Sequence, residues 1–264
     1  MQVVLDGRYH AERSVVALGM FDGVHIGHRV LLQKGRALAN RQDAPLVVCT
    51  FMEHPLTLIA PEKCPPLLTT FDERVRLMEA LGVDVLYAMP FDRSVMDMLP
   101  EEYVGQLVRR FHPTDVVCGY NHTYGREGRG TPALLSALGG ALGFAASVVP
   151  KITLDGAEVS STAIRALLGQ GDVAHAARLL GRPFMRQAAV ACHESEHCVL
   201  RMTPNGKQDV PRGEYRAVCS DGGKRWPALV HVESEGRARC RLPLGTQAHD
   251  EWTVEFLANV ALKG

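Results

Sequence analysis

Two histidines, His25 and His28, stand three residues apart in the stretch GMFDGVHIGH, residues 19–28. The apolar run before them is typical of a buried strand, and the stretch RVLLQKGRALAN after them has the spacing of a helix. Unpaired N–H groups at a helix start, together with the helix dipole, favour an anion. The placement therefore predicts that both imidazoles face one phosphate group, where they would stabilise the negative charge that develops during displacement at phosphorus.

Glycines on both sides of His25 support this interpretation, because backbone without a side chain can approach a ligand closely. The sequence has no Walker A motif, so it does not hold a nucleotide in the manner of a P-loop. The alternative is that the two histidines are ordinary polar residues of a turn. Their spacing alone does not exclude that alternative.

A second phosphate contact is predicted in VSSTAIR, residues 159–165. Ser160, Ser161 and Thr162 can cap a helix start, where hydroxyl and N–H groups would hold phosphate oxygens. Arg165, one turn later, adds a planar and permanently charged donor. The alternative is an ordinary helix cap followed by an arginine that faces solvent.

The stretch TFMEHP, residues 50–55, places His54 directly before Pro55 at the end of a predicted strand. A proline keeps the preceding backbone extended, which would aim the His54 side chain in a defined direction. The alternative is a turn that binds no ligand.

The stretch GYNHTYGREGRGT, residues 119–131, follows another predicted strand and combines several glycines with Asn121, Tyr124 and Arg126. Taken from its residues alone, the stretch predicts a flexible polar lid.

These stretches lie within an alternating series of strands and helices that fills the first two-thirds of the chain. Continuous valine-rich runs favour strands buried on both faces. Repeated strand–helix–strand units predict an α/β fold with a doubly wound, Rossmann-like parallel sheet. The predicted strands are Val15–Gly19, Leu46–Phe51, Val83–Pro90, Val116–Gly119 and Ala145–Val149. The predicted helices are His28–Asn40, Phe71–Leu81, Pro100–Phe111, Pro132–Leu142, Ser161–Leu168 and Val173–Leu180.

From Met185 onward the pattern changes to short alternating stretches separated by turns such as TPNG and SDGG. This pattern predicts a small antiparallel β domain. We place the boundary after residue 184, which gives a first domain of residues 1–184 and a second of residues 185–264.

The composition is that of a globular protein, with 46% hydrophobic and 22% charged residues among 264. The 29 basic residues balance the 29 acidic ones, so the overall charge favours neither nucleic acid nor an anionic membrane as a partner. We expect no signal peptide and no membrane span. Seven scattered cysteines fit reduced thiols, and hence a cytoplasmic location, better than a disulfide framework.

The stretch GMFDGVHIGH resembles the HxGH signature of the nucleotidyltransferase superfamily, whose histidines contact ATP phosphates and stabilise the transition state of nucleotidyl transfer. The order of the motifs narrows the resemblance to the N-terminal module of the prokaryotic FAD synthetases, which usually join an FMN adenylyltransferase to a riboflavin kinase. The resemblance covers residues 1–184. Besides the first stretch it rests on TFMEHP (50–55), LTTFDERVRLMEALGVDVLYAMPFD (68–92), GYNHTYGREGRGT (119–131) and VSSTAIRALLGQGDVAHAARLLGRPF (159–184).

The resemblance implies a role for each candidate residue. His25 and His28 would be catalytic. The implied ATP contacts are Gly19, Phe21, Gly23, Gly27, Ser161, Thr162 and Arg165, with the last three at the β and γ phosphates. The implied flavin and substrate contacts are His54, Pro55, Asn121, Tyr124 and Arg126.

The implied reaction transfers AMP from ATP to FMN and yields FAD and pyrophosphate. Mg²⁺ is expected to bridge the triphosphate, and we assign no residue of the chain as a metal ligand. ATP and FMN are the expected partners, with no nucleic acid and no membrane. The oligomeric state stays open.

The C-terminal part departs from the family pattern. After GRPF a riboflavin kinase should show a glycine-rich turn and a Pro-Thr-Ala-Asn motif, and neither is present. PRGEYRAV and DEWTVEFLANV still resemble parts of a kinase barrel. We therefore expect a vestigial barrel without kinase activity.

The stretch CHESEHC, residues 192–198, is symmetric, and on a hairpin its cysteines and histidines would face one another as soft-metal ligands. The alternative is an exposed polar hairpin tip, and no second cluster nearby supports a structural zinc.

Three other functions stay open at this stage. The chain could retain both kinase and adenylyltransferase activity. It could transfer a nucleotide to another substrate, such as pantetheine phosphate, although the flavin-family stretches extend beyond HxGH. It could also be a flavin- or nucleotide-binding protein that no longer catalyses, although the histidine pair and Ser161–Arg165 argue against that.

Overall fold

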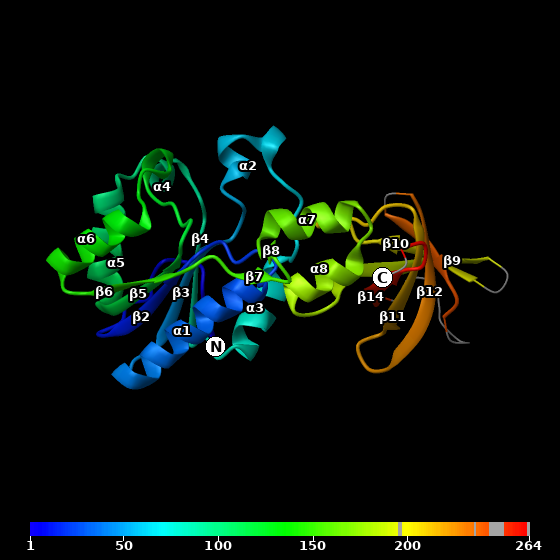
Figure 1. The fold of residues 1–264 in the computed structure, drawn as a ribbon, viewed down its shortest axis with the longest axis horizontal. Coiled ribbons are helices and arrows are strands. Elements are labelled where there is room, and N and C mark those ends of the chain that lie inside the picture. Colours follow the sequence, from blue (N-terminus) through cyan, green and yellow to red (C-terminus); the bar gives the residue numbers. More distant parts are fainter. Residues whose placement is uncertain (195–196, 235, 243–250, 263–264) are drawn as a thin grey trace. The chain divides into compact units, whose positions relative to one another are not determined.

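The computed structural model describes residues 1–194, 197–234, 236–242 and 251–262. The chain forms two compact units, shown in Figure 1: unit 1 contains Met1–Pro65 and Phe71–Thr153, and unit 2 contains Pro66–Thr70 and Leu154–Gly264. The sequence-based boundary after residue 184 instead follows the extent of the family module, and it stays a prediction.

Unit 1 is built on a six-stranded sheet in the order β1-β4-β3-β2-β5-β6, in which every neighbouring pair is parallel. The predicted doubly wound α/β fold is therefore confirmed. The strands are β1 (Gln2–Val4), β2 (Ser14–Leu18), β3 (Leu46–Phe51), β4 (Val85–Met89), β5 (Pro113–Gly119) and β6 (Ala145–Val149). The helices are α1 (Ile26–Gln42), α2 (Leu56–Ile59), α3 (Phe71–Ala80), α4 (Arg93–Met96), α5 (Pro100–Phe111) and α6 (Pro132–Leu142), with 3-10 turns η1 (Pro61–Lys63) and η2 (Arg126–Gly128).

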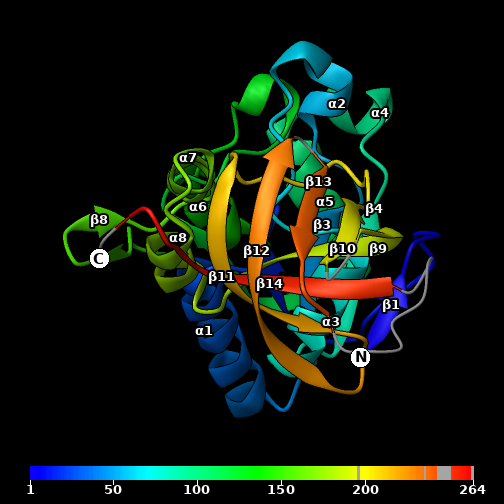
Figure 2. The same ribbon diagram turned by 90° about the vertical axis from the view of Figure 1, so that its right-hand side faces the viewer.

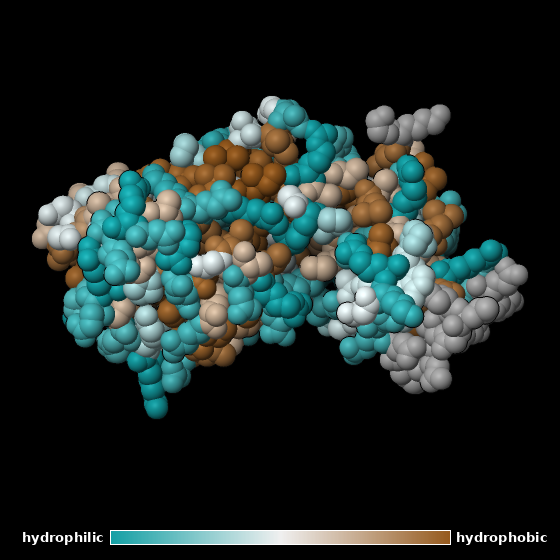
Figure 3. Space-filling view, turned by 90° about the horizontal axis from the view of Figure 1, so that it is seen from below, coloured by the Kyte–Doolittle hydropathy of each residue, from teal (hydrophilic) through white to brown (hydrophobic). Residues whose placement is uncertain are grey.

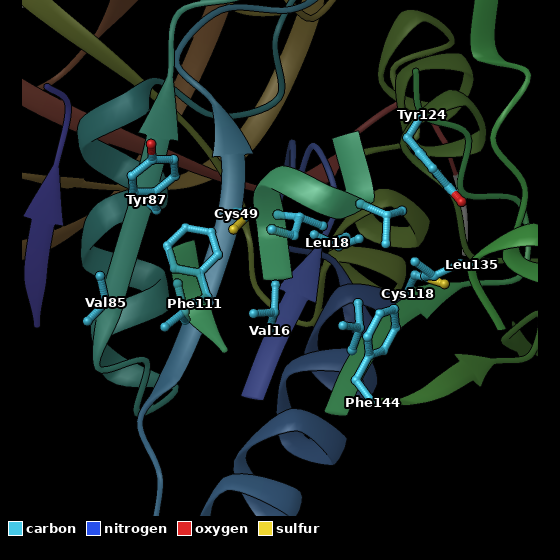
Figure 4. Packing of buried hydrophobic residues seen from close by; sticks show 14 of the residues in the cluster. Val16, Leu18, Cys49, Val85, Tyr87, Phe111, Cys118, Tyr124, Leu135 and Phe144 are labelled. Atoms are coloured by element: carbon cyan, nitrogen blue, oxygen red, sulfur yellow. The ribbon is translucent and has the colours of Figure 1, made fainter. Parts of the chain in front are cut away.

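Alternate residues of the central strands enter two hydrophobic clusters, one on each face of the sheet. Val16 and Leu18 of β2 pack in one cluster with residues of α5 and α6, as Figure 4 shows in part. Val15 and Ala17 pack in the other with residues of α1 and α3. All five residues of β2 are buried, because a central strand covered on both faces has no side that meets water.

The edges of the sheet differ from the sequence-based expectation. β6 is an edge strand, and four of its five residues are exposed or half-buried. β1 pairs with β4 at the opposite edge and was not predicted, because three residues carry too little periodicity to indicate a strand. The short helices α2 and α4 were missed for the same reason.

Unit 2 contains a closed barrel of six antiparallel strands in the order β10-β13-β12-β11-β14-β9, seen best in Figure 2. The predicted small antiparallel β structure is therefore confirmed. The strands are β9 (Phe184–Glu194), β10 (His197–Met202), β11 (Gly213–Ser220), β12 (Arg225–Ser234), β13 (Arg237–Cys240) and β14 (Glu251–Asn259). Helices α7 (Ser161–Gly169) and α8 (Val173–Leu180) precede the barrel, after a small sheet of β7 (Thr153–Leu154) and β8 (Ala157–Glu158).

The register of β9 and β10 corrects the interpretation of CHESEHC. Cys198 lies opposite His193, and His197 lies opposite Glu194, so the two cysteines are not paired across the hairpin. Like residues of this symmetric sequence would pair across the hairpin only if the pairing were centred on residue 195, and the observed register is displaced from that by one residue. Residues 195–196 of this stretch lie outside the described residues.

In the part of the chain that the structure describes, none of the seven cysteines forms a disulfide. No helix among the described residues is long and apolar enough to cross a membrane. Hydrophilic residues cover much of the surface face in Figure 3, and hydrophobic residues gather in separate areas between them.

The Phe111 side chain is a sensitive test of the packing in unit 1, because it is 1% exposed and contacts the Tyr87 ring edge-on at 5.0 Å. Phe111→Ala should lower the free energy of unfolding by about 3–5 kcal/mol through lost contacts and a cavity. Leu142→Ala, at an exposed position of α6, is the control and should change it by less than about 0.5 kcal/mol. Urea unfolding followed by far-ultraviolet circular dichroism measures both, and equal effects would contradict the packing described.

Candidate active site

Three of the predicted stretches follow parallel strands of unit 1 and therefore lie at the carboxyl ends of these strands. β3 lies on one side of β2 and β5 lies on the other, so the direction in which successive strands are added to the sheet reverses beside β2. Ligands of such sheets bind beyond the carboxyl ends of the strands at this reversal. The loops that follow β2, β3 and β5 carry the histidine pair, His54 and Asn121 respectively.

His25 is the N-cap residue of α1, in extended conformation, and its Nδ1 accepts a hydrogen bond from the His28 N–H at 3.3 Å. Since Nδ1 accepts, the proton of the neutral ring lies on Nε2. His25 can therefore present an N–H donor while it caps the helix. The helix begins two residues earlier than predicted because His25 supplies the cap that Ser, Thr, Asn or Asp usually provide.

His28 lies in the first turn of α1, and its ring stacks on the His25 ring at 3.6 Å between centroids and 16° between planes. The Phe21 and His28 rings meet edge to face, with their centroids 5.2 Å apart. The Nδ1 atom of His28 is buried and has no hydrogen-bond partner among the residues that the structure describes. Burial, and secondly the neighbouring His25, hold the pKa of His28 well below its usual 6.5. The two rings therefore form a close pair in which His28 is neutral near pH 7.

The loop that carries the pair is strained and apolar. Phe21 and Val24 have φ angles of +53° and +40°, a region that a β-branched residue such as valine rarely adopts. Each such residue costs of order 1–3 kcal/mol. Both side chains are fully buried against the core, so packing offsets the strain. A Cβ on Gly19 would lie 3.1 Å from the Phe21 ring, so a larger residue there would require the buried ring to shift by a few tenths of an ångström.

His54 follows β3, and its Nδ1 accepts a hydrogen bond from the Leu56 N–H at 3.1 Å. Pro55 is the N-cap residue of the short helix α2 and has helical angles. The hydrogen bond from Leu56 orients the imidazole and leaves the proton of the neutral ring on Nε2. A ligand contact by His54 or Pro55 stays a prediction.

The loop after β5 separates the three residues predicted there. Asn121 and Arg126 are exposed. Tyr124 is 6% exposed and packs in the core cluster with α5 and α6, where Figure 4 shows it. Burial raises the pKa of Tyr124 to about 12. A substrate contact by Tyr124 stays a prediction. Its buried ring anchors the loop to the core cluster.

His122 was not predicted. Its ring stacks on that of Tyr124 with the centroids 5.9 Å apart, its Nε2 is buried with no hydrogen-bond partner among the described residues, and burial lowers its pKa to about 4. The sequence offered only a histidine beside Asn121, and a lone polar residue in a glycine-rich loop carries no signal of burial.

Ser161, Thr162 and Arg165 lie in α7 of unit 2, and Ser160 caps that helix by accepting a hydrogen bond from the Ala163 N–H at 3.2 Å. The Nε of Arg165 donates to the Pro66 carbonyl at 2.7 Å. The helix start predicted from VSSTAIR is thus present. These residues and the histidine pair belong to different units, so their joint hold on one triphosphate stays a prediction.

Arg74 of α3 is a second residue that the sequence did not indicate. Its guanidinium is buried and donates to the carbonyls of Met20, Phe51 and Met52. An arginine inside an amphipathic helix usually faces water, so only the tertiary structure distinguishes it. Within the described part of the chain, no group of three or more His, Cys, Asp or Glu side chains is arranged to hold a metal ion.

A family model described as FAD synthetase matches residues 8–163. The chain belongs to the FAD synthetase family. The matched residues of this FAD synthetase family member include the histidine loop, His54, the loop after β5 and the start of α7 with Ser161 and Thr162, whereas Arg165 lies just beyond the match.

Named relatives agree. The bifunctional riboflavin kinase/FMN adenylyltransferase of Bacillus subtilis (strain 168) is 33% identical over 180 residues, which is 67% of this chain and 56% of the relative. The protein of the same description from Escherichia coli (strain K12) is 33% identical over 174 residues, 66% of this chain and 56% of the relative. The match thus spans little more than half the length of these curated relatives.

A solved structure supports the fold of the family member over nearly its whole length. The crystal structure of a protein described as macrolide-efflux protein from Streptococcus pneumoniae aligns with a TM-score of 0.87, covering 98% of this chain and 91% of that one. At 23% sequence identity this likeness concerns the fold alone.

The low pKa of His28 predicts that binding of a triphosphate is coupled to the uptake of a proton from solvent. A phosphate beside the imidazole favours its charged form and raises its pKa, so ATP binding near neutral pH should take up protons. His28→Asn should bind ATP without that uptake, and His10→Asn, at an exposed position, should behave as the unmodified protein. Calorimetric titration in two buffers of different ionisation enthalpy measures the uptake, and an unchanged value in His28→Asn would contradict the assignment.

Proposed function

We propose that the protein is an FMN adenylyltransferase, which transfers AMP from ATP to FMN and releases FAD and pyrophosphate. The observation that carries this proposal is the stacked His25–His28 pair at the start of α1, in which the buried Nδ1 of His28 has no hydrogen-bond partner within the described part of the chain. Polar atoms buried without partners are costly. A phosphate group at the helix start would supply the missing partner and use the positive end of the helix dipole.

In the proposed reaction, an oxygen of the FMN phosphate attacks the α-phosphorus of ATP, and the bond to the pyrophosphate oxygen breaks. FMN is itself the nucleophile, so no covalent enzyme intermediate is required. The chain then acts by aligning the two substrates and stabilising charge at phosphorus. The Nε2–H donors of His25 and His54 suit this role, because each ring is oriented by a backbone N–H at its Nδ1.

Mg²⁺ enters as part of the substrate, bound to the triphosphate, and we assign it no dedicated ligand in the chain. Ser161, Thr162 and Arg165 are proposed to hold the β and γ phosphates, which become the leaving pyrophosphate. A helix start capped by Ser160 supports that role, because its first N–H groups lie beside two hydroxyls. The hydrogen bond from Arg165 to the Pro66 carbonyl orients the guanidinium.

We further propose that the barrel lacks riboflavin kinase activity. The relatives are described as bifunctional, but the aligned part covers 56% of each of the two compared above, and the barrel sequence lacks the two kinase features. The second candidate function is that of a bifunctional riboflavin kinase and FMN adenylyltransferase. The presence of a closed six-stranded barrel favours this alternative.

Offering the two flavins separately tests the proposal. With ATP and Mg²⁺, FMN should yield FAD and pyrophosphate, whereas riboflavin should yield neither FMN nor FAD. His28→Ala should bind FMN with little change and lower kcat by roughly 10²–10³-fold, because it removes charge stabilisation in the transition state. Chromatography of the flavin products decides the outcome. FMN formed from riboflavin would overturn the loss of the kinase, and binding without turnover would favour a non-catalytic protein.

The arginine of α7 gives an independent prediction for ATP. Arg165→Ala should raise the KM for ATP about tenfold or more and leave the KM for FMN nearly unchanged, because a charged hydrogen bond to phosphate is lost. Arg178→Ala is the matched control, since Arg178 lies on neighbouring α8 and pairs with Asp155. Steady-state kinetics with each substrate varied measures both constants. Equal effects of the two substitutions on the KM for ATP would contradict the role of Arg165.

A further inference from the structure

The guanidinium group of Arg74 is buried inside unit 1 and does not reach solvent. The residue is 3% exposed, and its aliphatic stem runs from α3 to the edge of the sheet where β2 and β3 end. One terminal nitrogen donates to the carbonyls of Met20 and Phe51, each at 3.1 Å, and the other donates to the carbonyl of Met52 at 2.6 Å. One planar group therefore joins two separate loops.

One of the two loops carries the candidate catalytic residues His25 and His28, and the other carries the candidate substrate contact His54. Met20 directly precedes Phe21, the first of the two strained residues of the histidine loop. Met52 lies two residues before His54. The hydroxyl of Thr50 also donates to the Met20 carbonyl, at 3.2 Å. The backbone at Met20 is thus held by two donors immediately before the chain enters its left-handed conformation.

The attachment of α3 to the sheet does not require this charge. Met78 of α3 is fully buried in the core, and Val75 and Leu77 pack against the same cluster. Burying a guanidinium costs several kcal/mol unless its donors are well paired. Burial also lowers the pKa of Arg74, and the Asp22 carboxylate of the histidine loop opposes that shift. A buried cation in this position indicates a role other than packing.

We propose that Arg74 is a positioning residue, whose guanidinium holds the loop of His25 and His28 at a set distance from the loop of His54. Arginine suits the role because its planar donors reach carbonyls in different directions. A lysine has all its donors on one nitrogen, so it keeps the charge and loses the geometry. The inference rests on the proposed function only for its kinetic readout, since the hydrogen bonds themselves are independent of the reaction.

The test compares Arg74→Lys with Arg36→Lys. Arg36 lies in the same unit and donates to the Gly82 carbonyl at 2.9 Å and to Asp84 at 2.7 Å, beside the amino ends of β3 and β4. It is thus a matched arginine at the opposite end of the strands. Arg74→Lys should lower kcat for FAD formation roughly tenfold to a hundredfold, because small displacements of catalytic groups are costly. Arg36→Lys should leave kcat within about twofold.

Hydrogen–deuterium exchange provides the readout that does not depend on catalysis. In Arg74→Lys, the segments 20–24 and 52–54 should both exchange faster, while the segment containing Asp84 stays unchanged. In Arg36→Lys the pattern should reverse. If the unmodified protein forms no FAD, the proposed function fails, and the exchange pattern alone then decides the inference. Unchanged exchange in the two loops, or a loss of kcat equal in both variants, would overturn it.

Discussion

The carboxyl end of β2 is the constraint on which the site depends. β2 lies between β3 and β5 and is buried on both faces, so the chain must leave it at the edge of the sheet and turn at once into α1. The turn places Phe21 and Val24 in left-handed conformations that only their burial in the core makes tolerable. The core of unit 1 therefore holds the histidine loop in a shape that an isolated peptide would not adopt.

That shape has an electrostatic consequence. Because the loop is short, His25 becomes the helix cap and its ring lies flat on His28. Burial, and secondly the neighbouring His25, hold the pKa of His28 well below its usual value and so favour its neutral form. A phosphate bound there, as proposed, would favour the protonated imidazole instead. A histidine pair could then adapt its charge to such a ligand, which a pair of arginines cannot do.

Membership of the FAD synthetase family is established by the first part of the chain and says nothing about the activity of the barrel. The family model ends at residue 163, before the barrel begins. Beyond that residue the structure shows a closed six-stranded barrel, and its sequence lacks the glycine-rich turn and the Pro-Thr-Ala-Asn motif expected of a riboflavin kinase. A barrel is stabilised by the alternation of inward apolar residues, and many sequences satisfy that pattern. The barrel fold therefore says little about kinase chemistry, which is why product analysis is needed.

The sequence by itself determined the parallel sheet, the antiparallel β region and the position of the histidines between a strand and a helix, because valine runs, helical spacing and turn residues are local signals. It did not indicate that His25 caps α1, that Tyr124 lies in the core, or that Arg74 joins two loops. The hairpin pairing at Cys192–Cys198 was also wrong by one residue. Each of these features depends on residues far apart in the chain or on register, and only the tertiary structure decides which groups are buried together and which atoms remain to meet a ligand.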